Sequence, residues 1–244
     1  WIRDIGMDRI PPRPEGDRPI TQWRPEVYSF DFERVLVKVS GDTLHFRNPI
    51  VMPLEARYGG GQVVKAADEG RIRHVGVENL HLRSEFSHEE DEDHGWNAIY
   101  ADHVEHGWVR DITARHFGYS AVNLENGSKH MTVFRSTSLD PVSIVTGSRR
   151  YSFNNNGQMN LVMECRARSG RHDFVTGARI GGPNVFVDGV AELAHNDIGP
   201  HQRWASGVLY DRIVTDGQLN VQNRLHRGSG HGWSGIIHVV WNSK

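Results

Sequence analysis

The chain contains 244 residues and carries 28 Lys and Arg against 30 Asp and Glu, a formal charge of −2. This balance excludes a strongly basic surface for nucleic acid or for an anionic membrane, and no apolar run reaches the roughly 18 residues of a membrane span. A single cysteine, Cys165, excludes a disulfide framework and a zinc site built on cysteines. The 26 glycines and 7 tryptophans are instead typical of a soluble β protein with many turns.

The first 26 residues contain two notable features, a short string that recurs later in the chain and a proline-rich stretch. Residues 1–5 (WIRDI) repeat residues 108–112 (WVRDI) almost letter for letter, which predicts that the chain starts inside a coil and is a fragment of a longer protein. A chance match between two five-residue strings is the alternative. Five prolines between positions 11 and 25 predict an extended loop over residues 10–26 that crosses the surface of the fold.

A short repeat organises the chain from residue 74 onward. Five segments begin with His or Asn and continue as a β-type stretch, with first residues at positions 74, 106, 130, 160 and 184. The uneven spacing of these positions indicates a coil of constant size with insertions at some corners, and a sixth copy is expected at Asn220. Residues 238–242 look like the start of a further coil. Because no helical periodicity separates the segments, we predict a single all-β domain over residues 1–244, a parallel β-helix without visible end caps.

An acidic loop interrupts the first of these spacings. Residues 84–97 are expected to protrude, and they contain five consecutive acidic residues between His88 and His94. Carboxylate oxygens are the ligands that Ca²⁺ prefers, so this loop is the candidate metal site, with Asp91 and Asp93 as the first ligands. A solvated acidic loop without metal is the alternative, and the sequence predicts no other cofactor.

Seven strings in the second half of the chain carry a family resemblance; they lie at residues 114–118, 139–143, 149–153, 170–175, 182–186, 198–205 and 228–233. Together they resemble the pectate-lyase-like superfamily of right-handed parallel β-helices, in particular a group of larger bacterial β-helix proteins. The resemblance covers most of residues 70–242. It implies a right-handed β-helix, a secreted or periplasmic location, and activity as a polysaccharide lyase or a glycoside hydrolase. It supplies no catalytic residues that can be mapped onto this sequence.

Polar residues gather on two consecutive coils, one around residues 170–173 and one in a predicted protruding loop over residues 195–207. His172, counted from Asn160, and His195, counted from Asn184, stand at nearly the same place in their coils. Neighbouring coils are about 4.8 Å apart, so these segments should form adjacent layers on one face. The candidate catalytic residues are His172, Asp173, Arg179, Asp197, His201 and Arg203. The candidate substrate-binding residues are Arg150, His195, Trp204, Arg224, His231 and Trp233.

These residue types suit an acidic polysaccharide as the partner. In a lyase, His172 or His201 would abstract the proton next to a uronate carboxylate, while Arg203 or Arg179 would neutralise that carboxylate. In a hydrolase, Asp173 and Asp197 would flank the glycosidic bond. Three further interpretations stay open. Each His has a structural role on its coil, the protein binds glycans without catalysis, or the chain is a structural section of a longer β-helix.

Overall fold

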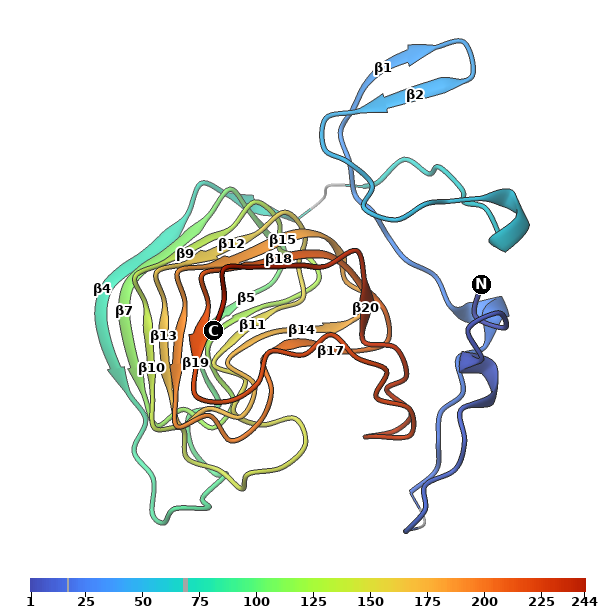
Figure 1. The fold of residues 1–244 in the computed structure, drawn as a ribbon. Coiled ribbons are helices and arrows are strands. Elements are labelled where there is room, and N and C mark those ends of the chain that lie inside the picture. The colour runs from blue at the N-terminus through green and yellow to red at the C-terminus, as the bar shows by residue number, and fades with distance from the viewer. Residues whose placement is uncertain (17, 68–69) are drawn as a thin grey trace.

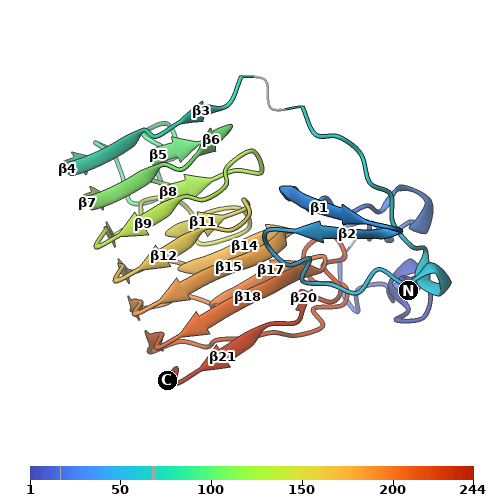
Figure 2. The same ribbon diagram turned by 90° about the horizontal axis from the view of Figure 1, so that it is seen from above.

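The computed structural model describes residues 1–16, 18–67 and 70–244. The chain is all-β, and its parallel strands wrap into stacked coils from residue 72 onward, an arrangement consistent with a parallel β-helix (Figures 1 and 2). The described helices are single 3₁₀ turns, namely η1 (Met7–Arg9), η2 (Pro25–Val27) and η3 (Ala56–Tyr58). None of the described residues belongs to a helix with the length and hydropathy needed to cross a membrane.

Two parallel sheets form the walls of the coils. The first has twelve strands: β4 (Gly76–Arg83), β7 (Trp108–Arg115), β9 (Thr132–Phe134), β10 (Thr137–Leu139), β12 (Leu161–Met163), β13 (Arg166–Arg168), β15 (Gly181–Val187), β16 (Val190–Glu192), β18 (Ala205–Asp211), β19 (Val214–Thr215), β20 (Gly235–Ile236) and β21 (Val239–Trp241). The second has five: β5 (Asn97–Ala101), β8 (Ser120–Leu124), β11 (Phe153–Asn155), β14 (Phe174–Ala178) and β17 (Gly199–Gln202). Two small sheets remain, a parallel pair of β3 (Ile72–Arg73) with β6 (Val104–Glu105) and an antiparallel hairpin of β1 (Leu36–Ser40) with β2 (Thr43–Phe46).

The register of the large sheet confirms the repeat and corrects its alignment. One inward column runs through Val77, Val109, Val133, Val162, Phe186, Tyr210 and Val240. The sequence alignment is therefore right for its first three copies and one residue out of step for the last two. The residue equivalent to His130 is Met159, not Asn160, and both have a positive φ, of 53° and 58°. A bend of the same backbone shape thus accepts His or Met, which hid the register.

Two predictions for the last coils have opposite outcomes. The sixth copy of the repeat is not at Asn220. β18 is the sixth copy, because it pairs directly with β15. Leu219, the residue before Asn220, forms a bridge with Ile198 beside the five-stranded sheet. The coil expected at residues 238–242 is confirmed, since β21 pairs with β18.

Each coil bends at residues in the left-handed region. Asp111, Arg135, Asp188 and Arg212 have φ values between 45° and 56°, a conformation that costs a non-glycine residue about 1–2 kcal/mol. Their side chains stack outside the bend and pair between coils, Arg135 Nε with Asp111 Oδ1 at 2.8 Å and Arg212 Nη2 with Asp188 Oδ2 at 2.8 Å. Each of these two pairs thus joins bends of opposite charge on successive coils.

The core inside the coils is a stack of apolar side chains. Phe153 lies parallel to Phe174, with ring centroids 5.5 Å apart, and Phe186 lies parallel to Tyr210 at 5.3 Å. Cys165 is buried in the same core. These rings are among the largest fully buried side chains of the protein, and each removes a large apolar area from water.

Residues 1–67 lie beside the coils rather than within them (Figure 2). The prediction that residues 1–5 start inside a coil is wrong, because residues 2–5 form a turn whose side chains join a separate cluster around Trp23. The nearly identical segment at residues 108–112 forms a strand, because it pairs with β4 on one side and with β9 on the other. Of the extended loop predicted over residues 10–26, residues 10–24 are extended or bent as expected, whereas η2 begins at Pro25; residue 17 lies outside the described residues.

The two predicted protruding loops also differ in outcome. No strand interrupts the segment between Arg83 and Asn97, as expected for a loop. The segment 195–207 does not protrude: β17 begins at Gly199, and residues 197–201 are buried. This segment enters the five-stranded sheet because its backbone pairs with β14.

Candidate functional site

The structure brings three of the predicted histidines together where the five-stranded sheet meets the last coil. The ring centroids of His172 and His201 are 4.5 Å apart, and those of His201 and His231 are 4.8 Å apart. Tyr151, one coil before His172, lies against both His172 and His201, and its hydroxyl is 3.1 Å from His201 Nε2. We call Tyr151, His172, Asp197, His201, Arg224 and His231 the histidine cluster.

Asp197 orients His172 through two contacts. His172 Nδ1 lies 2.6 Å from the Asp197 carbonyl oxygen, which can only accept, so this nitrogen carries the proton. The Asp197 carboxylate oxygen Oδ1 lies 3.4 Å from the same nitrogen. The other nitrogen, Nε2, therefore keeps its lone pair and has no hydrogen-bond partner among the described residues.

The Asp197 carboxylate is held in turn by the last coil. Arg224 donates to its Oδ2, and Gln222 Nε2 lies 3.3 Å from the same oxygen. The segment 222–232 that carries these residues closes on itself, since Arg224 N donates to Gly232 O at 2.8 Å. It joins the end of β17, where Arg203 N donates to His231 O at 2.9 Å.

Burial sets the charges within the histidine cluster. Desolvation, helped by the charge of Arg171, lowers the pKa of His172 to about 4, and desolvation with the charge of Arg203 lowers that of His231 to about 3. The pKa of His201 also falls well below its usual value, mainly through burial. Burial acts to raise the pKa of Asp197, but the hydrogen bond and charge of Arg224 outweigh it and hold that pKa below its usual range. At neutral pH the cluster thus contains neutral imidazoles around one charged carboxylate.

Three predicted site residues near the cluster have other environments. Asp173 is fully buried and accepts a hydrogen bond from Ser152 Oγ at 2.6 Å, and burial raises its pKa to about 7. Arg150 is buried and donates to the carbonyl and hydroxyl oxygens of Ser143. His195 is exposed. Asp173 and Asp197, which a hydrolase would use together, therefore have different hydrogen-bond partners, Ser152 and Arg224.

The N-terminal segment occupies the remaining predicted residues. Trp204 packs at a tilt against Trp1, with ring centroids 4.7 Å apart, so Trp1 covers part of its ring. Arg179 lies over the Tyr28 ring at 5.2 Å, and Arg203 Nη2 donates to Ser229 Oγ at 2.7 Å. Trp233 is 38% exposed, and its backbone N lies 3.4 Å from Met7 Sδ. The repeat does not encode contacts with residues 1–67, so the sequence alone places Trp204 and Arg179 on a substrate face.

Tyr151 is absent from the residues predicted from the sequence, although the sequence contains a signal for it. Trp96, Tyr119 and Tyr151 stack on successive coils at 6.3 and 5.2 Å, and each stands immediately or almost immediately before a strand of the five-stranded sheet. An aromatic residue just before each strand of this sheet is therefore the pattern that indicates Tyr151, one coil before His172.

The acidic loop uses its central carboxylate for its own structure. Asp91 Oδ2 accepts from both the backbone N and the hydroxyl of Ser87 at 2.8 Å, and Oδ1 accepts from Asp93 N at 2.9 Å. These hydrogen bonds hold the pKa of Asp91 far below its usual value. The neighbouring Glu92 pairs with Arg149. Across residues 1–16, 18–67 and 70–244, no group of three or more His, Cys, Asp or Glu side chains is placed to hold a metal ion.

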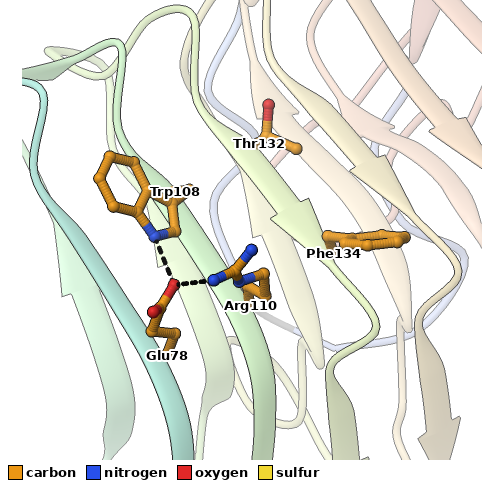
Figure 3. A pocket seen from close by; sticks show the side chains of 5 residues that line it. All are labelled: Glu78, Trp108, Arg110, Thr132 and Phe134. Carbon is orange, nitrogen blue, oxygen red and sulfur yellow. Dashed lines mark hydrogen bonds and ion pairs between the residues drawn. The ribbon is translucent and has the colours of Figure 1, made fainter.

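A second feature with an open surface lies on the outer face of the large sheet. A shallow groove of about 370 Å³ is lined by Glu78, Trp108, Arg110, Thr132 and Phe134, from β4, β7 and β9 (Figure 3). We call it the outer groove.

Comparisons of the chain with known protein families, with curated proteins and with solved structures gave no match. The function is therefore argued from these two sites.

Proposed function

We propose that this protein is a polysaccharide lyase that cleaves uronate-containing chains by β-elimination at the histidine cluster. The observation that carries the proposal is His172, whose Nδ1–H is fixed by Asp197 while Nε2 keeps a free lone pair. A neutral, oriented imidazole is what a general base requires. The resemblance to right-handed β-helices of the pectate-lyase-like superfamily supports the same activity and a secreted or periplasmic location.

In the proposed reaction, His172, Tyr151 and Arg171 each have one role. His172 Nε2 takes the proton from C5 of the uronate, the C4–C5 double bond forms, and the bond from C4 to the glycosidic oxygen breaks. The Tyr151 hydroxyl gives its proton to the departing oxygen, so protons and electrons balance. Arg171, whose charge acts on His172, neutralises the uronate carboxylate and stabilises the carbanion-like transition state.

This mechanism requires movement of the last coil. His172 is 1% exposed and His201 is 6% exposed, and the segment 222–232 contacts Asp197 through Arg224 and His201 through His231. A sugar can reach Nε2 only when this segment swings away, as lids do in many enzymes.

The test is activity of two variants against a matched control. H172A and Y151F should each reduce the release of unsaturated uronate ends by at least about a hundredfold, the usual scale for loss of a general acid or base. H81A alters an exposed histidine of β4, outside the cluster, and should keep wild-type activity. Full activity in H172A, with folding shown by circular dichroism, would remove the cluster from the mechanism.

A second candidate function is glycan binding without catalysis, and the burial of His172 and His201 favours it. It predicts saturable binding of a polysaccharide whose chain length stays unchanged. The glycoside hydrolase alternative has less support, because Asp173 contacts Ser152 whereas Asp197 pairs with Arg224. Reducing ends released without unsaturated ends would favour the hydrolase.

A further inference from the structure

The outer groove is built from two rows of side chains on three neighbouring strands. Gly76, Trp108 and Thr132 are paired across β4, β7 and β9, and two residues further along Glu78, Arg110 and Phe134 are paired in the same way. Residues two apart on a strand point to the same face, so all of these side chains stand on the outside of the sheet (Figure 3). The groove therefore lies on a different wall of the coil from the histidine cluster.

The Trp108 ring is held in a fixed position. It lies over Gly76, where a Cβ atom would come within 2.1 Å of the ring. Its Nε1 donates to Glu78 Oε2 at 3.0 Å, and Arg110 Nη2 lies 2.6 Å from the same oxygen. The residue is nevertheless 39% exposed. A flat aromatic surface is thus open to solvent and set in place before any ligand arrives, which lowers the entropy cost of binding.

The charges around the groove are already paired. Glu78 neutralises Arg110, and the nearby Arg135 pairs with Asp111 through two hydrogen bonds of 2.8 and 2.9 Å while its guanidinium covers the Phe134 ring at 4.1 Å. An anionic ligand would have to break one of these pairs to find a counterion. A ligand with hydroxyl groups can add hydrogen bonds to the pair without breaking it.

We propose that the outer groove is a binding site for a neutral saccharide. One sugar ring lies with its C–H face on Trp108, and its hydroxyls contact Glu78, Arg110 and Thr132. The stacking uses the apolar face of the ring, and the paired charges give orientation, as a few polar groups do in most ligand pockets. The site is independent of the lyase proposal, which concerns acidic sugars at other residues.

The test is calorimetric titration of the whole chain with cellohexaose, mannohexaose and xylohexaose, and with hexagalacturonate as the acidic probe. At least one neutral oligosaccharide should bind. W108A should weaken that binding at least about tenfold. G76A retains the ring but displaces it, so it should weaken binding in the same direction. The matched control is W241A, on the same outer face at β21 and 67% exposed, which should bind like the wild type.

Three outcomes would overturn the proposal: no neutral oligosaccharide binds, hexagalacturonate alone binds and W108A does not affect it, or W241A weakens binding as much as W108A. Lyase activity in the same preparations reports on the histidine cluster alone. Loss of one result without the other therefore identifies which proposal has failed.

Discussion

Glu33 anchors the N-terminal segment to the coils, and its replacement by Gln measures the strength of that anchor. Its Oε1 and Oε2 lie 2.7 and 2.9 Å from Arg71 Nη1 and Nη2, and Lys129 Nζ contacts Oε1. The side chains of Arg71 and Lys129 are only 9% and 12% exposed. The hydrogen bonds from Arg71 lower the pKa of Glu33 from 4.5 to about 2, against the opposing effect of burial and with help from Lys129.

The pKa shift sets the size and the pH range of the effect. A fall from 4.5 to about 2 corresponds to roughly 3 kcal/mol at neutral pH, and partial exposure of the carboxylate to solvent reduces the expected value to about 2 kcal/mol. Because the pKa is lowered in the folded state, this stabilisation is present above pH 4.5 and is lost as the pH falls towards 2. Urea unfolding should therefore show E33Q less stable by about 2 kcal/mol at pH 7, with the difference gone near pH 2.

The control for this experiment is E55Q. Glu55 pairs with Arg57 at 2.7 Å, but both side chains are well exposed, at 45% and 68%, so E55Q should unfold like the wild type. The reasoning is refuted if E33Q matches the wild type at pH 7, or if its loss is the same at pH 7 and at pH 2.

Three further predictions concern the coils. F174A removes a fully buried ring from the core stack and should lower the free energy of unfolding by about 3–5 kcal/mol in chemical denaturation; a loss below about 1 kcal/mol would contradict the stack. N184A leaves Asn160 N without its acceptor and Gly157 O without its donor, and should cost about 1–3 kcal/mol in chemical denaturation. N184D should also destabilise the protein, because its buried carboxylate can accept from Asn160 N but cannot donate to Gly157 O. His172 has a pKa lowered from 6.5 to about 4, so its contribution to stability is lost as the pH falls through this range; the melting temperature of H172Q should therefore decline less between pH 6.5 and pH 4 than that of the wild type.

The sequence was most informative where the coil constrains it. Inward columns repeat Val at 77, 109, 133 and 162, and this regularity predicted stacked parallel strands. The exact pairing register of the later coils was not predicted, because the equivalent left-handed bends hold His130 in one coil and Met159 in the next, and these side chains have no chemistry in common. A bend requires a particular backbone conformation, and the residue types alone do not show which positions adopt it.

The candidate site was predictable only within the repeat. Stacking of consecutive coils brought His172 and His201 together, and the last coil added Arg224 and His231. The covering of Trp204 by Trp1 was not predictable, since the two residues lie far apart in the chain and no pattern in the repeat links them. Contacts between a solenoid and a segment outside it follow from side-chain fit, which spacing does not encode.

The most direct test of the central claim is incubation of the protein with a panel of acidic and neutral polysaccharides, with and without Ca²⁺, while ultraviolet absorbance and reducing ends are recorded together. The lyase proposal predicts that both signals rise in parallel on a uronate-containing chain, since each β-elimination creates one unsaturated end and one reducing end. Reducing ends without absorbance, or silence in both channels across the panel, would contradict it.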